Sequence, residues 1–245
     1  MKPVKIVLVY QSVLGIYGDQ GNAKVLLKRL ERRGLAAELV SVEPGDLVPD
    51  DADIYLLGGG EDMAQISAVR ALQADGNLMV GLDRGAVLFA VCAGYQICGR
   101  TFTVGDRDEV VEGLGLLDVD TRRGPRRAVG EVLHAWNRPD GSTSRVTGFE
   151  NHGGWTTLGP EATPLCTVEV GVGNDGQGTE GARQQLASGG HVIGTYPHGP
   201  VLVRNPELAD HLLELATGTE LEPLEMPELD ELRRQRIAAV RSARR

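Results

Sequence analysis

The stretch Leu88-Phe-Ala-Val-Cys-Ala-Gly-Tyr-Gln96 decides the fold, because an apolar strand runs in it directly into a cysteine and the start of a helix. Small residues flank the cysteine, as a sharp strand-to-helix turn requires: Ala90, Ala93 and Gly94. This pattern is the cysteine version of the nucleophile elbow. It predicts that the sulfur of Cys92 lies at the carboxyl end of a strand and beside a helix N-terminus, which exposes the thiol and favours the thiolate. The alternative is a buried core cysteine that ends an apolar strand.

The residues before this stretch alternate between strand and helix patterns. Apolar runs predict strands at 5–10, 37–42, 53–57 and 86–91, and helical periodicity predicts helices at 23–33 and 61–75. Gly34 is placed to end the first of these helices. Strand–helix alternation predicts an α/β fold of the flavodoxin-like type, with a mixed, mostly parallel central sheet and helices on both faces.

The second half of the chain has shorter strand patterns, at 130–135, 144–149, 165–170 and 191–196, which suggest antiparallel or mixed pairing. Residues 171–190 are rich in Gly, Gln and Ser and are expected to form a loop, and a helix is expected at 206–217. We therefore predict one domain at 1–226 and a helical tail at 227–245. Acidic residues begin the tail and arginines end it, which suits the helix dipole. The tail is either a solvated helix end or an element that docks on a partner or contacts lipid headgroups.

Composition excludes several classes of protein. The 245 residues are 41% hydrophobic and 24% charged, with a net charge of −9, which fits a soluble globular protein and argues against nucleic acid as a general partner. No apolar stretch is long enough to predict a transmembrane segment. Three cysteines cannot build a disulfide framework, and Cys92 and Cys98 match no usual zinc or redox spacing, so we expect a cytoplasmic protein without a metal site.

A thiol nucleophile needs a base, and His198 is the histidine best placed to supply it. It follows the predicted strand at 191–196, and strand ends in a doubly wound sheet gather in one crevice. The alternative is an ordinary loop histidine. We expect His134 and His211 to be structural and His191 to be exposed.

Acyl transfer also needs donors for an oxyanion. The triplet Gly58-Gly-Gly60 ends a predicted strand and lets backbone N–H groups point into the crevice. Gly60 and the amide of Ala93 are the expected donors. A glycine triplet alone is also compatible with a simple tight turn.

Together these motifs resemble the class I glutamine amidotransferase family over nearly the whole chain. The order is Gly-Gly-Gly, then Cys-x-Gly-x-Gln, then a late Tyr-Pro-His-Gly. Three further segments, 16–22, 148–154 and 194–200, resemble the cobyric-acid-synthase-like branch. Within that branch they are most similar to GatD, the family of glutaminase subunits of lipid II isoglutaminyl synthases.

The resemblance implies roles for individual residues. Cys92 would attack the glutamine side-chain amide, and His198 would exchange the protons. The implied substrate-binding residues are Gly59, Gln96, Arg127, Asn151 and His152. Arg127 would anchor the α-carboxylate of glutamine; otherwise it is a solvated arginine in a basic loop, 122–127, that could also contact a partner or an anion. Asn151 and His152 either border the site or form a structural turn.

One position departs from the family pattern. Most class I members carry Glu two residues after the histidine, and this chain has Pro200, which cannot orient an imidazole. His198 is therefore expected to lack an orienting carboxylate in this chain. In the GatD group, an aspartate of the partner subunit is expected to complete the triad.

The resemblance also implies a partner and an acceptor. The partner would be a Mur-ligase-like synthetase subunit (MurT) in a heterodimer that binds ATP and Mg²⁺, since this chain has no phosphate-binding loop motif and is expected to hold no cofactor. Ammonia would amidate the D-Glu α-carboxylate of lipid II, which this chain reaches through the partner. Three alternatives remain open: ammonia supply for a corrinoid-type (cobyric acid) amidation, a cysteine hydrolase or peptidase, and a non-catalytic binding subunit.

Overall fold

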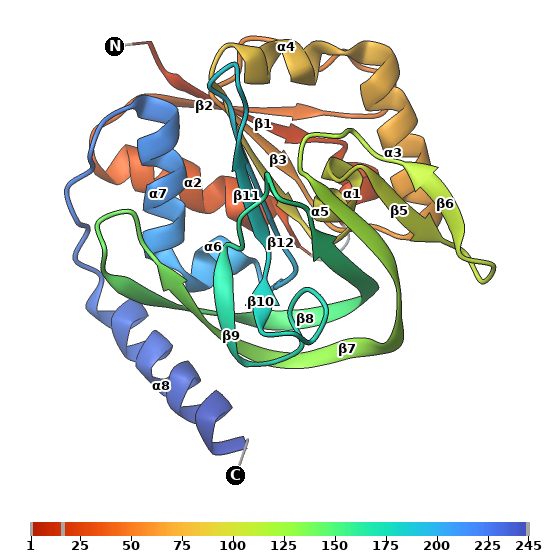
Figure 1. Cartoon of the computed structure of the whole chain (residues 1–245). Coiled ribbons are helices and arrows are strands. Elements are labelled where there is room, and N and C mark those ends of the chain that lie inside the picture. Colours follow the sequence, from red (N-terminus) through yellow and green to blue (C-terminus); the bar gives the residue numbers. More distant parts are fainter. Residues whose placement is uncertain (1, 16–17, 244–245) are drawn as a thin grey trace.

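A six-stranded sheet forms the centre of the fold in the computed structural model, which describes residues 2–15 and 18–243 (Figure 1). Ile16 and Tyr17 of the 16–22 motif, and the last two residues of the tail, lie outside the described residues. In spatial order the strands are β11 (Ala182–Gln185), β12 (His191–Thr195), β4 (Val87–Val91), β3 (Ile54–Leu57), β1 (Val4–Val9) and β2 (Ala37–Val42). Every neighbouring pair is parallel except β11 with β12. The predicted mixed, mostly parallel central sheet is confirmed.

Helices cover both faces of this sheet, as predicted (Figure 1). On one face lie α2 (Gln20–Arg32), the short α6 (Val201–Arg204) and α7 (Pro206–Thr217); on the other lie α3 (Asp62–Asp75) and α5 (Ala93–Cys98). The central strands β3 and β4 are buried along their whole length, which explains their continuous apolar sequences. Two more short helices, α1 (Gln11–Leu14) and α4 (Asn77–Asp83), follow β1 and α3.

A second sheet, which is largely antiparallel, packs beside the first. Its strands are β5 (Thr101–Val104), β6 (Glu109–Glu112), β7 (Val119–Asn137), β8 (Thr143–Leu158), β9 (Cys166–Val170) and β10 (Thr179–Glu180). The strands β7 and β8 form one long hairpin, far longer than the two short strands that the sequence indicated. Residues 171–190 are also not a single loop, because β10 and β11 lie within them.

The hairpin corrects two loop predictions. Residues 122–127 belong to β7, where the pairing with β8 shifts between Arg123 and Ala128, and residues 148–154 belong to β8. The glycines of β8 resemble turn signals in the sequence, although in the structure they are needed for close packing. A Cβ on Gly154 would lie 2.4 Å from Nε2 of Gln96, and a Cβ on Gly148 would lie 2.5 Å from Cβ of Pro197. The glycines of β8 therefore let the second sheet approach the segments that contain Gln96 and Pro197.

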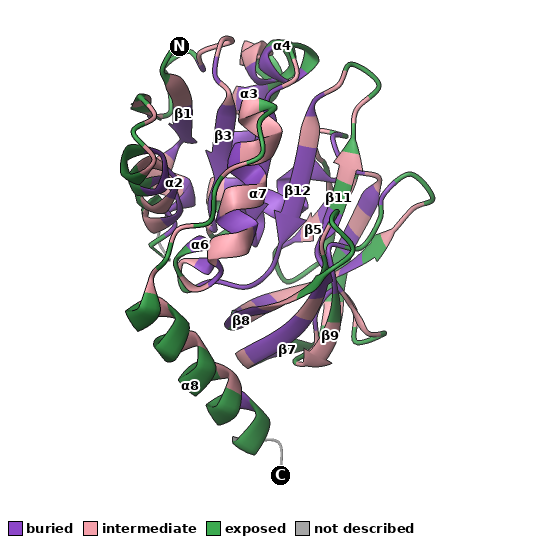
Figure 2. Cartoon of the chain, turned by 90° about the vertical axis from the view of Figure 1, so that its left-hand side faces the viewer, coloured by how far each residue is buried: buried purple, intermediate pink, exposed green. Residues whose placement is uncertain are grey.

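The tail contains α8 (Pro227–Ala243), which projects from the body with a mostly exposed surface (Figure 2). Ion pairs connect it to the body: Arg233 with Glu207 at 2.6 Å, and Arg241 with Glu169 at 3.5 Å. The Arg233–Glu207 pair is partly buried, whereas the Arg241–Glu169 pair has an exposed arginine and contributes little stability. The division of the chain at residue 226 stays a prediction. Across 2–15 and 18–243, the structure has no helix that is both long and apolar enough to cross a membrane.

Candidate functional site

Cys92 lies at a strained turn between β4 and α5. Its backbone has φ 52° and ψ −105°, a left-handed conformation that costs a non-glycine residue free energy and is common at functional sites. Its N–H donates to the carbonyl of Thr195 at 2.8 Å, which ties the turn to β12. Gly94 has to be small, because a Cβ there would lie 2.8 Å from Cβ and the carbonyl oxygen of Leu57. The elbow geometry predicted around Cys92 is present, but the residue is buried, at 8% exposure, rather than exposed as expected.

His198 reaches the same edge of the sheet from the end of β12. Two backbone hydrogen bonds fix it to β8: the N–H of His198 donates to the carbonyl of Phe149 at 2.9 Å, and the N–H of Phe149 donates to the carbonyl of His198 at 3.1 Å. The side chain is buried. Burial alone lowers the pKa of His198, but hydrogen-bonding and charge interactions with Asp19 and Cys92 outweigh it and raise the pKa to about 9. Asp19 and Cys92 therefore favour the protonated form of the imidazole.

Asp19 corrects the expectation that His198 has no carboxylate neighbour in this chain. Its Oδ1 lies 3.9 Å from Nδ1 of His198, and both side chains are almost completely buried. Pro200 cannot supply a carboxylate, but Asp19, the residue that precedes α2, places one beside the imidazole. The sequence did hold a usable signal: Asp19 follows β1, and β1 ends at the same sheet edge as β4.

The glycine triplet lies next to this pair. The N–H of Gly59 donates to Oδ2 of Asp19 at 2.7 Å, so it is already engaged and is not available to a substrate. Gly60 lines the pocket in front of Cys92, and Gly59 is not among the lining residues. Within the described residues, no hydrogen-bond acceptor is seen for the N–H groups of Gly60 and Ala93, so both remain candidate oxyanion donors.

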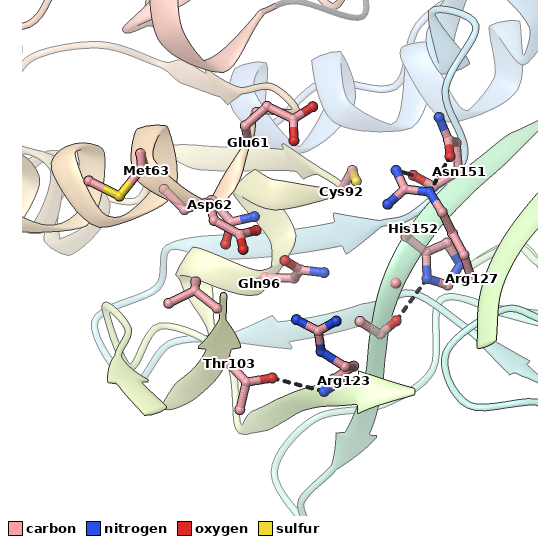
Figure 3. Close-up of a pocket in the computed structure, with 15 residues that line it drawn as sticks. Glu61, Asp62, Met63, Cys92, Gln96, Thr103, Arg123, Arg127, Asn151 and His152 are labelled. Carbon is pink, nitrogen blue, oxygen red and sulfur yellow. Dashed lines mark hydrogen bonds between the residues drawn. The ribbon is translucent and has the colours of Figure 1, made fainter. Parts of the chain in front are cut away.

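A pocket of about 440 Å³ opens over Cys92 (Figure 3). Figure 3 shows Glu61 and Asp62, from the start of α3, on one side of the sulfur and Arg127 and Asn151 on the other. The lining residues are Gly60, Glu61, Asp62, Met63, Gln65, Cys92, Gln96, Thr103, Val104, Arg123, Arg127, Asn151, His152, Gly153 and Gly154. The pocket thus has acidic groups on one wall and basic groups on the other. The acidic wall was not identified from the sequence, where Glu61 and Asp62 read only as a helix start.

Arg127 is held in the pocket wall by Asn151 on the neighbouring strand. Its Nε donates to Oδ1 of Asn151 at 2.7 Å, and its guanidinium also donates to the Asn151 carbonyl at 3.3 Å. The second basic group, Arg123, is engaged elsewhere, because its Nε donates to Oδ1 of Asp108 at 2.6 Å. Arg127 is therefore better placed than Arg123 to bind a carboxylate of a ligand.

Gln96 and His152 form the inner wall of the pocket and share Tyr196 as a neighbour. Nε2 of Gln96 donates to the Tyr196 hydroxyl at 3.3 Å, and that hydroxyl also lies 2.6 Å from Oγ1 of Thr156. The ring of His152 stacks on Tyr196 with centroids 3.7 Å apart, and its Nδ1 bonds the Gly154 carbonyl at 2.8 Å. His152 thus touches the pocket while its ring is fixed by the surrounding core.

The remaining cysteines and histidines lie away from Cys92. Burial raises the pKa of Cys98 and Cys166 far above the ordinary thiol value, so neither is a competing nucleophile. Burial lowers the pKa of His134 to about 4 within β7, and lowers that of His211 to about 4 on α7. His191 is half-buried at the start of β12 rather than exposed as expected, and it lines a pocket together with residues of β11 and α7.

Comparisons with known proteins agree with this geometry. Residues 5–206 match the profile of the CobB/CobQ-like glutamine amidotransferase domain. The GatD subunit of lipid II isoglutaminyl synthase (glutamine-hydrolyzing) from Staphylococcus aureus strain N315 is 33% identical over 220 residues, which cover 89% of this chain and 86% of that protein.

Two further proteins place the chain more broadly. Cobyric acid synthase from Sphingopyxis alaskensis is 36% identical over 182 residues, but the match covers 72% of this chain and 34% of that protein. A crystal structure of a glutamine amidotransferase has the same fold, with a TM-score of 0.58 and 21% identity over 87% of this chain and 99% of that one. Since the family profile spans most of its length, the chain belongs to the CobB/CobQ-like glutamine amidotransferase family.

Proposed function

We propose that this chain is a glutaminase subunit that hydrolyses L-glutamine to glutamate and ammonia, with Cys92 as nucleophile and His198 as proton carrier. The observation that carries the proposal is the buried pair itself: a strained elbow cysteine that lines a pocket with a basic and an acidic wall, with the side chain of His198 beside it. Family membership supports glutamine as the substrate.

The charges of the pocket suit a free amino acid. Arg127 binds the α-carboxylate of glutamine with its guanidinium, which Asn151 holds in place. Glu61 on the facing wall binds the α-ammonium group. The side-chain amide then extends towards Cys92 and passes Gln96. A ligand with both charges and a short side chain satisfies both walls at once.

The chemistry has two halves. Sγ of Cys92 attacks the amide carbon, and the N–H groups of Gly60 and Ala93 stabilise the oxyanion of the tetrahedral intermediate. The carbon–nitrogen bond breaks as His198 donates a proton to the departing nitrogen, which leaves ammonia and a glutamyl thioester on Cys92. In the second half, His198 takes a proton from water, the resulting hydroxide attacks the thioester, and glutamate leaves as the thiol is restored.

The ammonia is used by a partner in this proposal. The partner is a Mur-ligase-like synthetase subunit (MurT) that binds ATP and Mg²⁺ and amidates the D-Glu α-carboxylate of lipid II, in the cytoplasm. The match to GatD of S. aureus supports this acceptor, because it covers 86% of that protein, whereas the match to cobyric acid synthase covers only 34% of that enzyme. Corrinoid-type amidation is the second candidate.

An isotope-transfer experiment tests the acceptor. Glutamine labelled with ¹⁵N in its side-chain amide is mixed with this chain, the candidate Mur-ligase-like subunit, ATP, Mg²⁺ and either lipid II or a corrinoid acid. We expect ¹⁵N in the new amide of the D-Glu residue and none in the corrinoid. Labelling of the corrinoid alone would contradict the lipid II assignment and leave the glutaminase assignment standing.

A further inference from the structure

We propose that Asp19 is the positioning residue for His198, and that this chain thus holds its own orienting carboxylate. The inference rests on the proposed function and deepens it. The carboxylate has two contacts, one through each oxygen. Oδ1 faces Nδ1 of His198 at 3.9 Å, and Oδ2 accepts the N–H of Gly59 at 2.7 Å. Asp19 therefore bridges the base and the glycine turn that precedes the oxyanion donor Gly60.

Two contacts hold the start of α2 against the segment that follows His198. Gly21 lies against the ring of Pro200 so closely that a Cβ at position 21 would be 2.3 Å from Cγ of Pro200. Oδ1 of Asn22 accepts the N–H of Leu202 at 2.9 Å. The start of α2 and the segment that follows His198 therefore pack against each other, and this packing places Asp19 next to the imidazole.

Pro200 belongs to this arrangement. It offers a compact apolar surface to Gly21 of the helix that follows Asp19. Gly58 completes the fit, because a Cβ at that position would lie 2.8 Å from Oδ2 of Asp19. Pro200 and Asp19 are therefore two parts of the same packing.

The separation of 3.9 Å is that of an ion pair and exceeds a direct hydrogen bond. Catalytic hydrogen bonds are commonly long before substrate binds and shorten in the Michaelis complex. With Nδ1 turned towards Asp19, the other ring nitrogen is the one that exchanges a proton with Cys92. The titratable groups that raise the pKa of His198 include Asp19, which precedes α2, and Cys92, which follows β4.

The test is the pH dependence of glutamine hydrolysis in the Asp19→Asn variant. Asparagine keeps an oxygen for the N–H of Gly59 but removes the charge beside His198. We expect kcat to fall about 10²- to 10³-fold, with KM changed less than about threefold. The alkaline limb of kcat/KM, which reports loss of the imidazolium proton, should move from near 9 towards the ordinary histidine value by more than about one unit.

Asp53→Asn is the matched control. Asp53 also accepts a backbone N–H at 2.7 Å, from Lys5, but it precedes β3 and so lies at the opposite end of the parallel strands from Cys92. We expect wild-type kcat and an unmoved alkaline limb in this variant. An Asp19→Asn variant that keeps the wild-type rate, or one that loses rate with the limb unmoved, would overturn the proposal.

A measurement without any variant covers the case in which Asp19→Asn does not fold. The NMR titration of the His198 ring in the wild-type chain should give a pKa near 9, and a value at or below 6.5 would overturn the role of Asp19. Failure of the underlying glutaminase assignment is distinguishable, because the wild-type chain would then release no ammonia with or without its partner. An active wild type whose Asp19→Asn variant behaves normally contradicts this inference alone.

Discussion

The guanidinium of Arg127 on β7 is bound by Asn151 on β8, with 2.7 Å between Nε and Oδ1, and both residues line the pocket over Cys92. Nε and Nη2 donate to Asn151, which leaves Nη1 of the guanidinium for a ligand. It also explains why a polar asparagine stands in a strand that packs against the catalytic edge of the first sheet.

We expect the Arg127→Ala variant to bind glutamine weakly. Loss of a charge-assisted bond of roughly 1.5–3 kcal/mol should raise KM about 10- to 100-fold, while kcat changes by less than about threefold. Steady-state ammonia release as a function of glutamine concentration measures both constants. Arg126→Ala is the control, because Arg126 is exposed and does not line the pocket. Equal effects of the two variants would show that Arg127 has no specific contact with glutamine.

The positive φ of Cys92 predicts that a cysteine at this position lowers the stability of the fold. With φ at 52°, glycine is easier to accommodate than any other residue. Cys92→Gly should therefore be more stable than Cys92→Ala by about 1 kcal/mol, although both are inactive. Urea denaturation of the two variants measures the difference. A Cys92→Ala variant as stable as Cys92→Gly would mean that the turn relaxes without cost.

The close contact between Gly21 and Pro200 predicts that a substitution of Pro200 restores stability that a substitution of Gly21 removes. Alanine at 21 improves helix propensity by about 1 kcal/mol, but its Cβ would overlap the proline ring, so Gly21→Ala should destabilise the chain by about 1–3 kcal/mol net and lower kcat. Adding Pro200→Ala removes the overlapping Cγ and should recover at least half of the stability. Lys24→Ala, on the exposed side of the same helix, should change the free energy of unfolding by less than about 0.5 kcal/mol. Unfolding curves without any recovery in the double variant would exclude a direct contact as the cause.

Stability should depend on pH through His198. Its folded pKa of about 9 lies above the ordinary value of 6.5, so its contribution is complete below about pH 6.5 and is lost as pH rises through 9. The free energy of unfolding of the wild type should exceed that of His198→Gln by an amount that shrinks by up to roughly 3 kcal/mol between pH 6 and pH 10. Paired denaturation curves at the two pH values measure this change. A difference that stays constant with pH would show that His198 titrates normally.

Much of the fold could be predicted because its signals are local. The run that ends at Cys92 combines an apolar strand with the small residues of a sharp turn, and the helix at 206–217 has the predicted bounds. The β7–β8 hairpin could not be predicted in the same way. Its glycines resemble turn signals in the sequence, and only the positions of Gln96 and Pro197 show why Gly154 and Gly148 have to be small.

The site shows the same limit. Cys92, Gln96, Arg127, Asn151 and His152 were chosen from the sequence, and all line one pocket. Gly59 does not line it, because its N–H is bound to Asp19. The role of Asp19 depends on a contact between segments 179 residues apart in the chain, the start of α2 and the end of β12, and no local pattern encodes such a contact. The functions of these residues stay predictions until variants are measured.

Ammonia and glutamate release from glutamine by the purified chain, alone and with its Mur-ligase-like partner, tests the central claim most directly. We expect equal amounts of the two products from the wild type, without a requirement for the partner's carboxylates, and a loss of at least about 10³-fold in Cys92→Ala. Cys98→Ala, which changes a buried cysteine outside the pocket, should keep the activity. Ammonia release that survives in Cys92→Ala, or a wild type that is inactive with and without the partner, would contradict the assignment of this chain as a cysteine-dependent glutaminase.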